Sequence, residues 1–282
     1  MAQRSPRARH HDEPFGWWGY RADRPVPLSV VELIARGSLD ARLAGFLWLA
    51  LERRASVVVA ARPPEAGKTT TLTALLDFLP VSVRPIYLRG WYERFEFLDE
   101  TTPEQAYLLC NEISSHLPTY LWGRGVRRLF AAMRDGYGMA TTVHAGGAAE
   151  VVDLLAAYPL EVPPELIRGI DLVLTLGVGL GPGGPVRRVM RLERIGSGDG
   201  WPVPETIAAR DVLLGALDAP AGRLTGVLVE RFGLEPAAAI AELAGREHFL
   251  ERLRDRGVRS VEAVRRELRA WTGEPRGTSA VD

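Results

Sequence analysis

The chain has 282 residues, 46% of them hydrophobic and 25% charged, which is an ordinary globular composition. Its 35 basic and 35 acidic side chains cancel, so the bulk charge does not indicate a nucleic-acid partner. Cys110 is the single cysteine, which excludes an intramolecular disulfide and fits a reducing, cytoplasmic location. The longest apolar run, Leu43 to Leu51, reaches only half of the roughly 20 residues that cross a bilayer, so we expect no transmembrane segment.

The predicted elements begin with a short helix near residue 29. Ser29 and Glu32 have the spacing of a capping box, in which a serine caps the helix and a glutamate follows three residues later. This helix should run to about Ala35 and end at Gly37. Ser38 is then expected to cap a second helix, whose apolar residues recur at helical spacing at Leu43, Phe46, Leu47 and Leu51.

From residue 56 onward, apolar strands alternate with helices. Strands are predicted at residues 56–60, 85–88, 107–110, 139–143, 171–176 and 186–195, and helices at 69–79 and 126–133. The last two strands are joined by the turn-rich segment 179–185. Strands that alternate with helices indicate an α/β fold, with a mainly parallel sheet covered on both faces.

The chain divides into three predicted regions. Residues 1–27 are expected to be a disordered tail, up to residue 13, and an aromatic lead-in. Residues 28–198 form the α/β core. Residues 199–282 form a C-terminal helical region, with the boundary near Gly198-Asp199-Gly200 and a frayed tail after Thr272. Helices in this region are predicted at 205–217, 224–232, 236–256 and 261–271.

The strongest functional motif follows the first strand of the core. The strand 56–60 leads into Arg62-Pro63-Pro64-Glu65-Ala66-Gly67-Lys68-Thr69, and a helix begins at once. Strand, loop and helix in this order are the context of a P-loop, whose backbone N–H groups cradle phosphates at the helix N-terminus. Lys68 is predicted to reach the β- and γ-phosphates of ATP, and the Thr69 hydroxyl to hold Mg²⁺. The predicted nucleotide contacts are Arg62, Glu65, Ala66, Gly67, Lys68, Thr69 and Thr70.

Arg62 stands where the P-loop pattern has its first glycine. Because an arginine must accept whatever backbone angles that position needs, we expect strain there of about 1–3 kcal/mol. The alternative to the whole assignment is a Gly-Lys-Thr tripeptide that occurs by chance in a turn. Its placement between an apolar strand and a helix favours phosphate binding.

A P-loop hydrolase also needs a carboxylate that holds the magnesium shell or polarises the attacking water. Glu112 follows the strand 107–110 and is predicted to do this, with Mg²⁺ bound through water; the alternative is a glutamate that only caps or pairs at the strand end. Glu93 follows the strand 85–88 and is predicted to be a second catalytic carboxylate, since ligands sit at the carboxyl ends of parallel strands. Cys110 is interpreted as a small buried side chain.

His144 directly follows the strand 139–143. An imidazole at the carboxyl end of a strand can sense whether the γ-phosphate is present. A lone histidine is more often structural, so its position alone leaves both roles open.

These residues resemble the type II/type IV secretion ATPase superfamily, especially its archaeal pilus and archaellum motor branch, over about residues 28–271. Residues 46–52 and 67–72 are similar to the helix and Walker A block of that branch, and residues 141–145 resemble its His box. Residues 102–112 resemble the approach to its atypical Walker B glutamate. The resemblance implies a RecA-like P-loop ATPase core that binds ATP and Mg²⁺, in which Glu112 and His144 take part in hydrolysis.

The resemblance also implies partners and a location. A motor of this kind is expected to work as a homo-oligomer, most often a hexamer, at the inner face of the cytoplasmic membrane, on an inner-membrane platform protein. No arginine of the core is convincingly placed by the sequence to neutralise the γ-phosphate, so a neighbouring subunit is expected to supply one. The candidates for this role are Arg94, Arg124, Arg127 and Arg128.

The chain departs from the family pattern in ways that keep other functions open. Where an acidic pair is expected, the strand 85–88 continues as Arg89-Gly90, which leaves only Glu93, and Asn111 replaces the usual glycine before Glu112. No counterpart of the family's N-terminal domain is found before the core. One alternative is therefore a diverged nucleotide-binding regulatory subunit without turnover. Another is an unrelated P-loop NTPase or small-molecule kinase.

Overall fold

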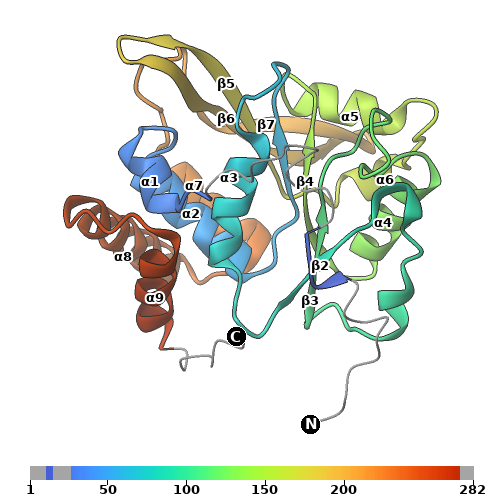
Figure 1. The fold of residues 1–282 in the computed structure, drawn as a ribbon, viewed down its shortest axis with the longest axis horizontal. Helices are drawn as coiled ribbons and strands as arrows, with labels where there is room; N and C mark the ends of the chain where they lie inside the picture. The colour runs from blue at the N-terminus through green and yellow to red at the C-terminus, as the bar shows by residue number, and fades with distance from the viewer. Residues whose placement is uncertain (1–10, 15–26, 274–282) are drawn as a thin grey trace.

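The computed structural model describes residues 11–14 and 27–273 (Figure 1). The predictions for residues 1–10, 15–26 and 274–282 lie outside the described residues. Residues 11–13 were expected to belong to a disordered tail, and here the structure differs. His11 Nε2 lies 3.2 Å from both carboxylate oxygens of Glu93, and Arg84 Nε donates to Asp12 at 2.6 Å. This short segment therefore lies against the body of the protein.

Seven strands form one sheet in the order β2-β3-β4-β1-β5-β6-β7. The first five in this order pair in parallel, and β6 and β7 pair antiparallel. The predicted α/β fold with a mainly parallel sheet is therefore confirmed. The strands are β1 (Val57–Ala60), β2 (Arg84–Tyr87), β3 (Ala106–Cys110), β4 (Gly138–Val143), β5 (Leu172–Gly181), β6 (Gly184–Gly198) and β7 (Trp201–Ala209).

Helices cover both faces of the sheet (Figure 1). One face carries α1 (Val30–Ala35), α2 (Ala41–Glu52), α3 (Lys68–Leu75), α7 (Ala221–Phe232), α8 (Pro236–Asp255) and α9 (Val261–Thr272). The other carries α4 (Arg124–Arg134), α5 (Ala148–Ala156) and α6 (Pro164–Ile167). Short 3₁₀ turns lie at Leu76–Phe78, Gly90–Tyr92 and Glu96–Asp99.

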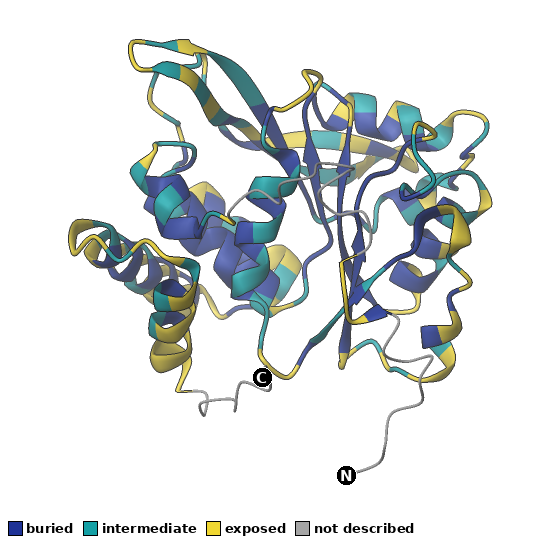
Figure 2. Ribbon diagram, in the orientation of Figure 1, coloured by how far each residue is buried: buried dark blue, intermediate teal, exposed yellow. Residues whose placement is uncertain are grey.

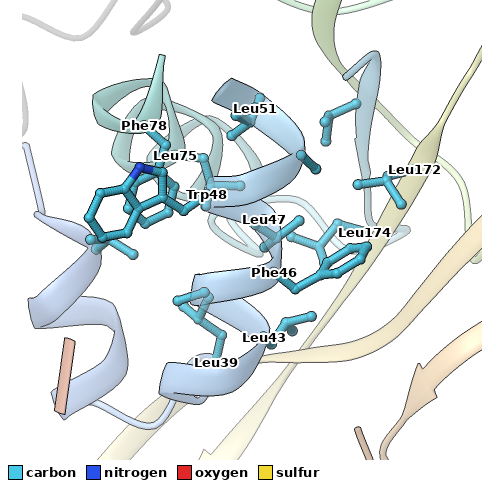
Figure 3. Packing of buried hydrophobic residues seen from close by; sticks show 14 of the residues in the cluster. Leu39, Leu43, Phe46, Leu47, Trp48, Leu51, Leu75, Phe78, Leu172 and Leu174 are labelled. Carbon is cyan, nitrogen blue, oxygen red and sulfur yellow. The ribbon is translucent and has the colours of Figure 1, made fainter. Parts of the chain in front are cut away.

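The central strands are buried on both faces, which explains their continuous apolar sequence. Along β1, Val57 and Val59 belong to one hydrophobic cluster and Val58 and Ala60 to the other, because successive side chains point to opposite faces. Figure 2 shows these strands as the buried centre of the molecule. The larger cluster is built around α2, where Trp48 stacks on Phe78 with ring centroids 5.3 Å apart (Figure 3).

The helix predicted at 205–217 is wrong, because Trp201–Ala209 forms strand β7, paired antiparallel with β6. The turn at Gly198-Asp199-Gly200, which was predicted to be a domain boundary, is the hairpin that joins the two strands. Asp199 and Gly200 have φ values of 48° and 82° there. Pro202 and Pro204 oppose a helix and are tolerated in β7 because it is an edge strand.

The predicted N-cap residues of α1 and α2 can be compared with the structure. Ser29 caps α1 as predicted, since its hydroxyl accepts a hydrogen bond from Glu32 N at 3.1 Å. The predicted cap of α2 at Ser38 is wrong, because Asp40 is the capping residue and accepts from Leu43 N at 2.7 Å. Helices α5 and α6 were not predicted. Within residues 11–14 and 27–273, no helix is both long and apolar enough to span a bilayer.

Candidate functional site

The segment between β1 and α3 has the geometry of a phosphate-binding loop. Gly67 is the N-cap residue of α3 with a φ of 89°, and Glu65 also has a positive φ of 56°. A Cβ on Gly67 would lie 3.1 Å from Arg187 Cδ, so both the backbone angle and the space favour glycine. The first N–H groups of α3 have no partner within the helix, and its first residues, Lys68 to Thr71, line the cavity described below.

The strain predicted at Arg62 is not found. Arg62 is not among the residues with positive φ, and Glu65 takes the left-handed conformation in its place. Arg62 does not line the cavity described below; its guanidinium reaches outward to Glu150 on α5. The structure therefore does not bring the Arg62 side chain to the predicted nucleotide contacts, whereas residues 65–70 all line the cavity.

A cavity of about 720 Å³ opens in front of the loop. The loop and the start of α3 form one wall, and Asn111, Glu112 and His144 form another. Further walls come from Arg36, Ser38 and Leu39 in the α1–α2 turn and from residues 185–189 at the start of β6. These two segments contribute both apolar and basic side chains to the cavity, with Leu39, Val186 and Val189 among the apolar ones.

Lys68, Glu112 and His144 converge at the mouth of the loop. Lys68 Nζ lies 3.1 Å from His144 Nε2 and 3.6 Å from Glu112 Oε2, and His144 Nε2 lies 3.5 Å from Glu112 Oε1. Glu112 follows β3, which is separated from β1 by β4 rather than adjacent to it. The residues are nevertheless brought together because β1, β3 and β4 are parallel and end at the same edge.

The site is buried and incompletely paired. Lys68 and Glu112 are each 8% exposed at the side chain. Burial lowers the pKa of Lys68, and the nearby Glu112 carboxylate only partly opposes this shift. Glu112 Oε1 has no hydrogen-bond partner within the part of the chain that the structure describes. A buried carboxylate oxygen without a donor is a group that a water or a bound ligand would satisfy.

Glu93 lies elsewhere. It does not line the cavity, and its side chain is fully buried and bonded. One carboxylate oxygen accepts from Arg89 N at 2.8 Å and the other from Phe95 N at 2.6 Å, in addition to the contact with His11. The geometry therefore gives no support to Glu93 as a second catalytic carboxylate, and it assigns this residue to closing the loop after β2. Cys110 is buried as predicted, and burial raises the pKa of its thiol to about 12.

The sequence placed no arginine of the core convincingly at the phosphates, and the structure brings three arginines to the cavity. Arg36, Arg187 and Arg188 all line the cavity, and Arg187 Nε donates to the carbonyl of Glu65 at 2.7 Å. Together with Lys68 they give the cavity four basic side chains, against the carboxylates Glu65 and Glu112. None of the four arginines predicted for a neighbouring subunit lines it: Arg94, Arg124, Arg127 and Arg128. Arg187 and Arg188 lie on β6 and Arg36 lies at the end of α1, so only the tertiary structure reveals that these three line one cavity.

No protein-family model matches the chain. Its relatives include two uncharacterised proteins of Methanocaldococcus jannaschii. MJ0900 is 27% identical over 190 residues, which cover 60% of this chain and 34% of MJ0900. MJ1287 is 25% identical over 246 residues, which cover 79% of this chain and 90% of MJ1287. This chain thus spans about a third of the length of the first relative and most of the second.

Three solved structures are distantly similar. The VirB11 ATPase of the Brucella suis type IV secretion system, in complex with sulphate, has a TM-score of 0.39 at 20% identity, over 54% of this chain and 52% of its own. The DotB ATPases of Yersinia pseudotuberculosis and Legionella pneumophila have TM-scores of 0.40 and 0.36 at 13% identity. They cover 86% and 80% of this chain and 63% and 60% of their own. The fold of this chain is established by its own strand order and phosphate loop.

Proposed function

We propose that this protein binds ATP in the cavity in front of Gly67-Lys68-Thr69 and hydrolyses it, as a motor subunit of a type II/type IV secretion or pilus-like assembly system. The observation that carries the nucleotide site is the convergence of Lys68, Glu112 and His144 at the N-terminus of α3. An excess of basic side chains around the cavity favours a polyanion such as a nucleoside triphosphate. The assignment to a secretion motor rests on the sequence resemblance.

The residues fit a nucleotide with Mg²⁺. Lys68 would hold the β- and γ-phosphates, and Thr69 would bind Mg²⁺ through its hydroxyl and Glu112 through water. When bound, the ion neutralises phosphate charge and orients the γ-phosphate. Glu112 Oε1 has no hydrogen-bond partner among the described residues and is free to accept a hydrogen bond from water. Glu112 would therefore orient the attacking water. His144, which contacts both Lys68 and Glu112, would sense the γ-phosphate.

Lys68 is the single lysine of the chain, which makes a direct test of the nucleotide site possible. We expect Mg-ATP to protect Lys68 from acetylation by an amine-reactive reagent, with the α-amino group of the chain as the internal reference. Lys68→Ala should also weaken binding of a fluorescent ATP analogue by at least tenfold, because it removes the ammonium nearest the phosphates. Equal labelling of Lys68 with and without ATP, together with unchanged affinity in the variant, would contradict the nucleotide site proposed here.

A diverged regulatory subunit is the second candidate, and one observation favours it. Glu93, the only carboxylate left where the family pattern has an acidic pair, is committed to the loop after β2. A nucleotide site that relies on Glu112 alone could bind ATP without turning it over. This candidate and the motor share the nucleotide site and differ only in hydrolysis.

A further inference from the structure

The loop that carries His144 is attached to the phosphate loop by Arg62, the residue at the position of the first P-loop glycine. We call residues 144–147, between β4 and α5, the His144 loop. Arg62 contacts this loop directly through its backbone carbonyl, and its side chain contacts Glu150 of α5, which in turn binds Gly146 of the loop.

The backbone contact is made to the histidine ring. Lys68 Nζ lies 3.1 Å from His144 Nε2 and 3.4 Å from Nδ1, so it can donate to either ring nitrogen. The two nitrogens differ in the acceptor beside them: the carbonyl oxygen of Arg62 lies 3.4 Å from Nδ1, and Glu112 Oε1 lies 3.5 Å from Nε2. A ring that is held against the Arg62 carbonyl carries its proton on Nδ1, because this is the form that donates to that acceptor.

The side-chain contact acts at the other end of the loop, where Arg191 also donates to the carbonyl of Gly146 at 2.7 Å. Arg62 Nε donates to Glu150 Oε2 at 3.2 Å, and Arg62 Nη2 contacts Glu150 Oε1. The same Oε2 accepts the backbone N–H of Gly146 at 2.7 Å. A Cβ on Gly146 would lie 2.6 Å from Arg62 Nε, so the guanidinium lies directly against the loop backbone. Hydrogen bonds from Arg62 and Gly146 lower the pKa of Glu150 and so favour its ionised form.

We propose that Arg62 and Glu150 form a latch that positions His144 against Lys68. Arg62 is then a positioning residue. The latch would serve the proposed nucleotide site, so its purpose rests on the proposed function. The Arg62 and Glu150 side chains are 72% and 41% exposed, so the pair adds little stability, and its effect should appear in the geometry of the loop.

A simpler role for Glu150 must be separated from the latch. Glu150 is the third residue of α5, and it accepts the N–H of Gly146, which precedes the N-cap residue Gly147, much as a capping glutamate does. If that were its whole role, Arg62 would be dispensable and His144 would not respond to its loss. The variants Arg62→Gln and Glu150→Gln make this distinction, because the amide oxygen introduced by Glu150→Gln still accepts from Gly146 but carries no charge for Arg62.

The test uses unliganded, ¹⁵N-labelled protein. Long-range ¹H–¹⁵N correlation of the imidazole rings, assigned with His144→Gln, should show His144 as the Nδ1–H tautomer in the wild type. In Arg62→Gln it should become a mixture of tautomers, and exchange of the Gly146 amide should accelerate about two- to fivefold, the range of an exposed ion pair. Glu150→Gln should change both signals in the same direction. The double variant should change them no more than either single variant does, because both substitutions break the same contact. Arg134→Gln, in an exposed ion pair away from the cavity, should change neither signal.

Nucleotide affinity adds an independent measurement. In Arg62→Gln the dissociation constant of the ATP analogue should rise by the same two- to fivefold factor. Unchanged His144 and Gly146 signals in Arg62→Gln, or effects that add in the double variant, would overturn the latch even if ATP protects Lys68. Failure of ATP to protect Lys68, together with unchanged affinity in Lys68→Ala, would overturn the proposed nucleotide site and leave the measurements on the unliganded protein intact.

Discussion

At the scale of single residues, the site combines groups that are individually unfavourable to bury. Lys68 is held in a position that lowers its pKa, and Glu112 keeps an oxygen that no described residue satisfies. A buried polar atom without a partner costs of order 1–3 kcal/mol in a protein. Groups of this kind are concentrated where a ligand binds, which is a physical reason to assign the chemistry to Glu112 rather than to the fully bonded Glu93.

Glu112→Gln separates the motor from the regulatory subunit. We expect the variant to bind ATP as tightly as the wild type or a few times more tightly, because a negative charge next to the phosphates is removed. Turnover should fall on the order of 10²-fold or more, since the amide cannot act as a carboxylate. Steady-state phosphate release is the measurement. No turnover in the wild type, with ATP protection of Lys68 intact, would instead favour the regulatory subunit.

At the scale of elements, the loop after β2 depends on one carboxylate. Glu93 accepts hydrogen bonds from the backbone at both Arg89 and Phe95, and Phe95 has a positive φ of 59°. Burial by itself would raise the pKa of Glu93, but the hydrogen bonds from His11 and these two amides hold it below the ordinary value of 4.5. The ionised carboxylate is therefore the form that stabilises this loop.

Glu93→Gln should destabilise the protein by about 1–2 kcal/mol at neutral pH, because one acceptor and its charge are lost. Since the folded pKa lies below 4.5, the carboxylate contribution is fully present above pH 4.5 and is lost as the pH falls through the folded value. The difference between variant and wild type should therefore shrink on acidification below pH 4.5, in urea titrations at a series of pH values. The affinity of Glu93→Gln for ATP at neutral pH should equal that of the wild type. A large loss of affinity would instead support a role for Glu93 in the nucleotide site.

At the scale of the whole molecule, α8 is joined to the core by a buried arginine. Arg246 is 7% exposed at the side chain, pairs with Glu52 of α2 at 2.7 Å and with Glu242, and lies 4.8 Å above the Trp48 ring. Residues of α2, α7, α8 and α9 belong to one hydrophobic cluster. The C-terminal helices are thus packed on the core through apolar and ionic contacts together.

Arg246→Ala should destabilise the protein by about 2–3 kcal/mol, because it removes the closest ionic partner of the half-buried Glu52 carboxylate, which keeps only its contacts with Arg53 and Trp48. Arg246→Met combined with Glu52→Gln should recover much of this loss. In each variant, unfolding followed by tryptophan fluorescence and by far-UV circular dichroism should coincide, as for one cooperative unit. Two separate transitions would mean that the C-terminal helices unfold independently of the sheet.

The proposed motor should also assemble, and this prediction tests the homo-oligomer, hexamer included. Light scattering should show a larger species with Mg-ATP than without it, and specific activity should fall on dilution if neighbouring subunits complete the site. The cavity already contains Arg36, Arg187 and Arg188 of the same chain, so a monomer with full activity at low concentration would assign the phosphate-neutralising charge to these residues. Location at the inner face of the membrane and a platform-protein partner are part of the same proposal.

The sequence by itself determined the elements whose signals are local. The continuous apolar runs of β1 and β3 follow from burial on both faces of a parallel sheet, and Gly67-Lys68-Thr69 placed the phosphate loop at the start of a helix. Glu112 was found for the same reason, because it follows a strand whose carboxyl end had to lie near that loop. The N-cap of α1 was predicted correctly at Ser29, whereas the N-cap of α2 was predicted at Ser38, two residues before the actual cap at Asp40.

Only the tertiary structure decided which of these residues meet. β7 is a strand because β6 offers it an edge to pair with, a condition that its own polar and proline-containing sequence does not reveal. Glu93 and Glu112 both follow parallel strands, yet the backbone amides of its own loop hold Glu93 away from the cavity, while Glu112 faces Lys68. Arg187 reaches the loop because the β5–β6 hairpin folds over it. These outcomes depend on contacts between segments distant in the chain, and pattern and propensity act only over neighbouring residues.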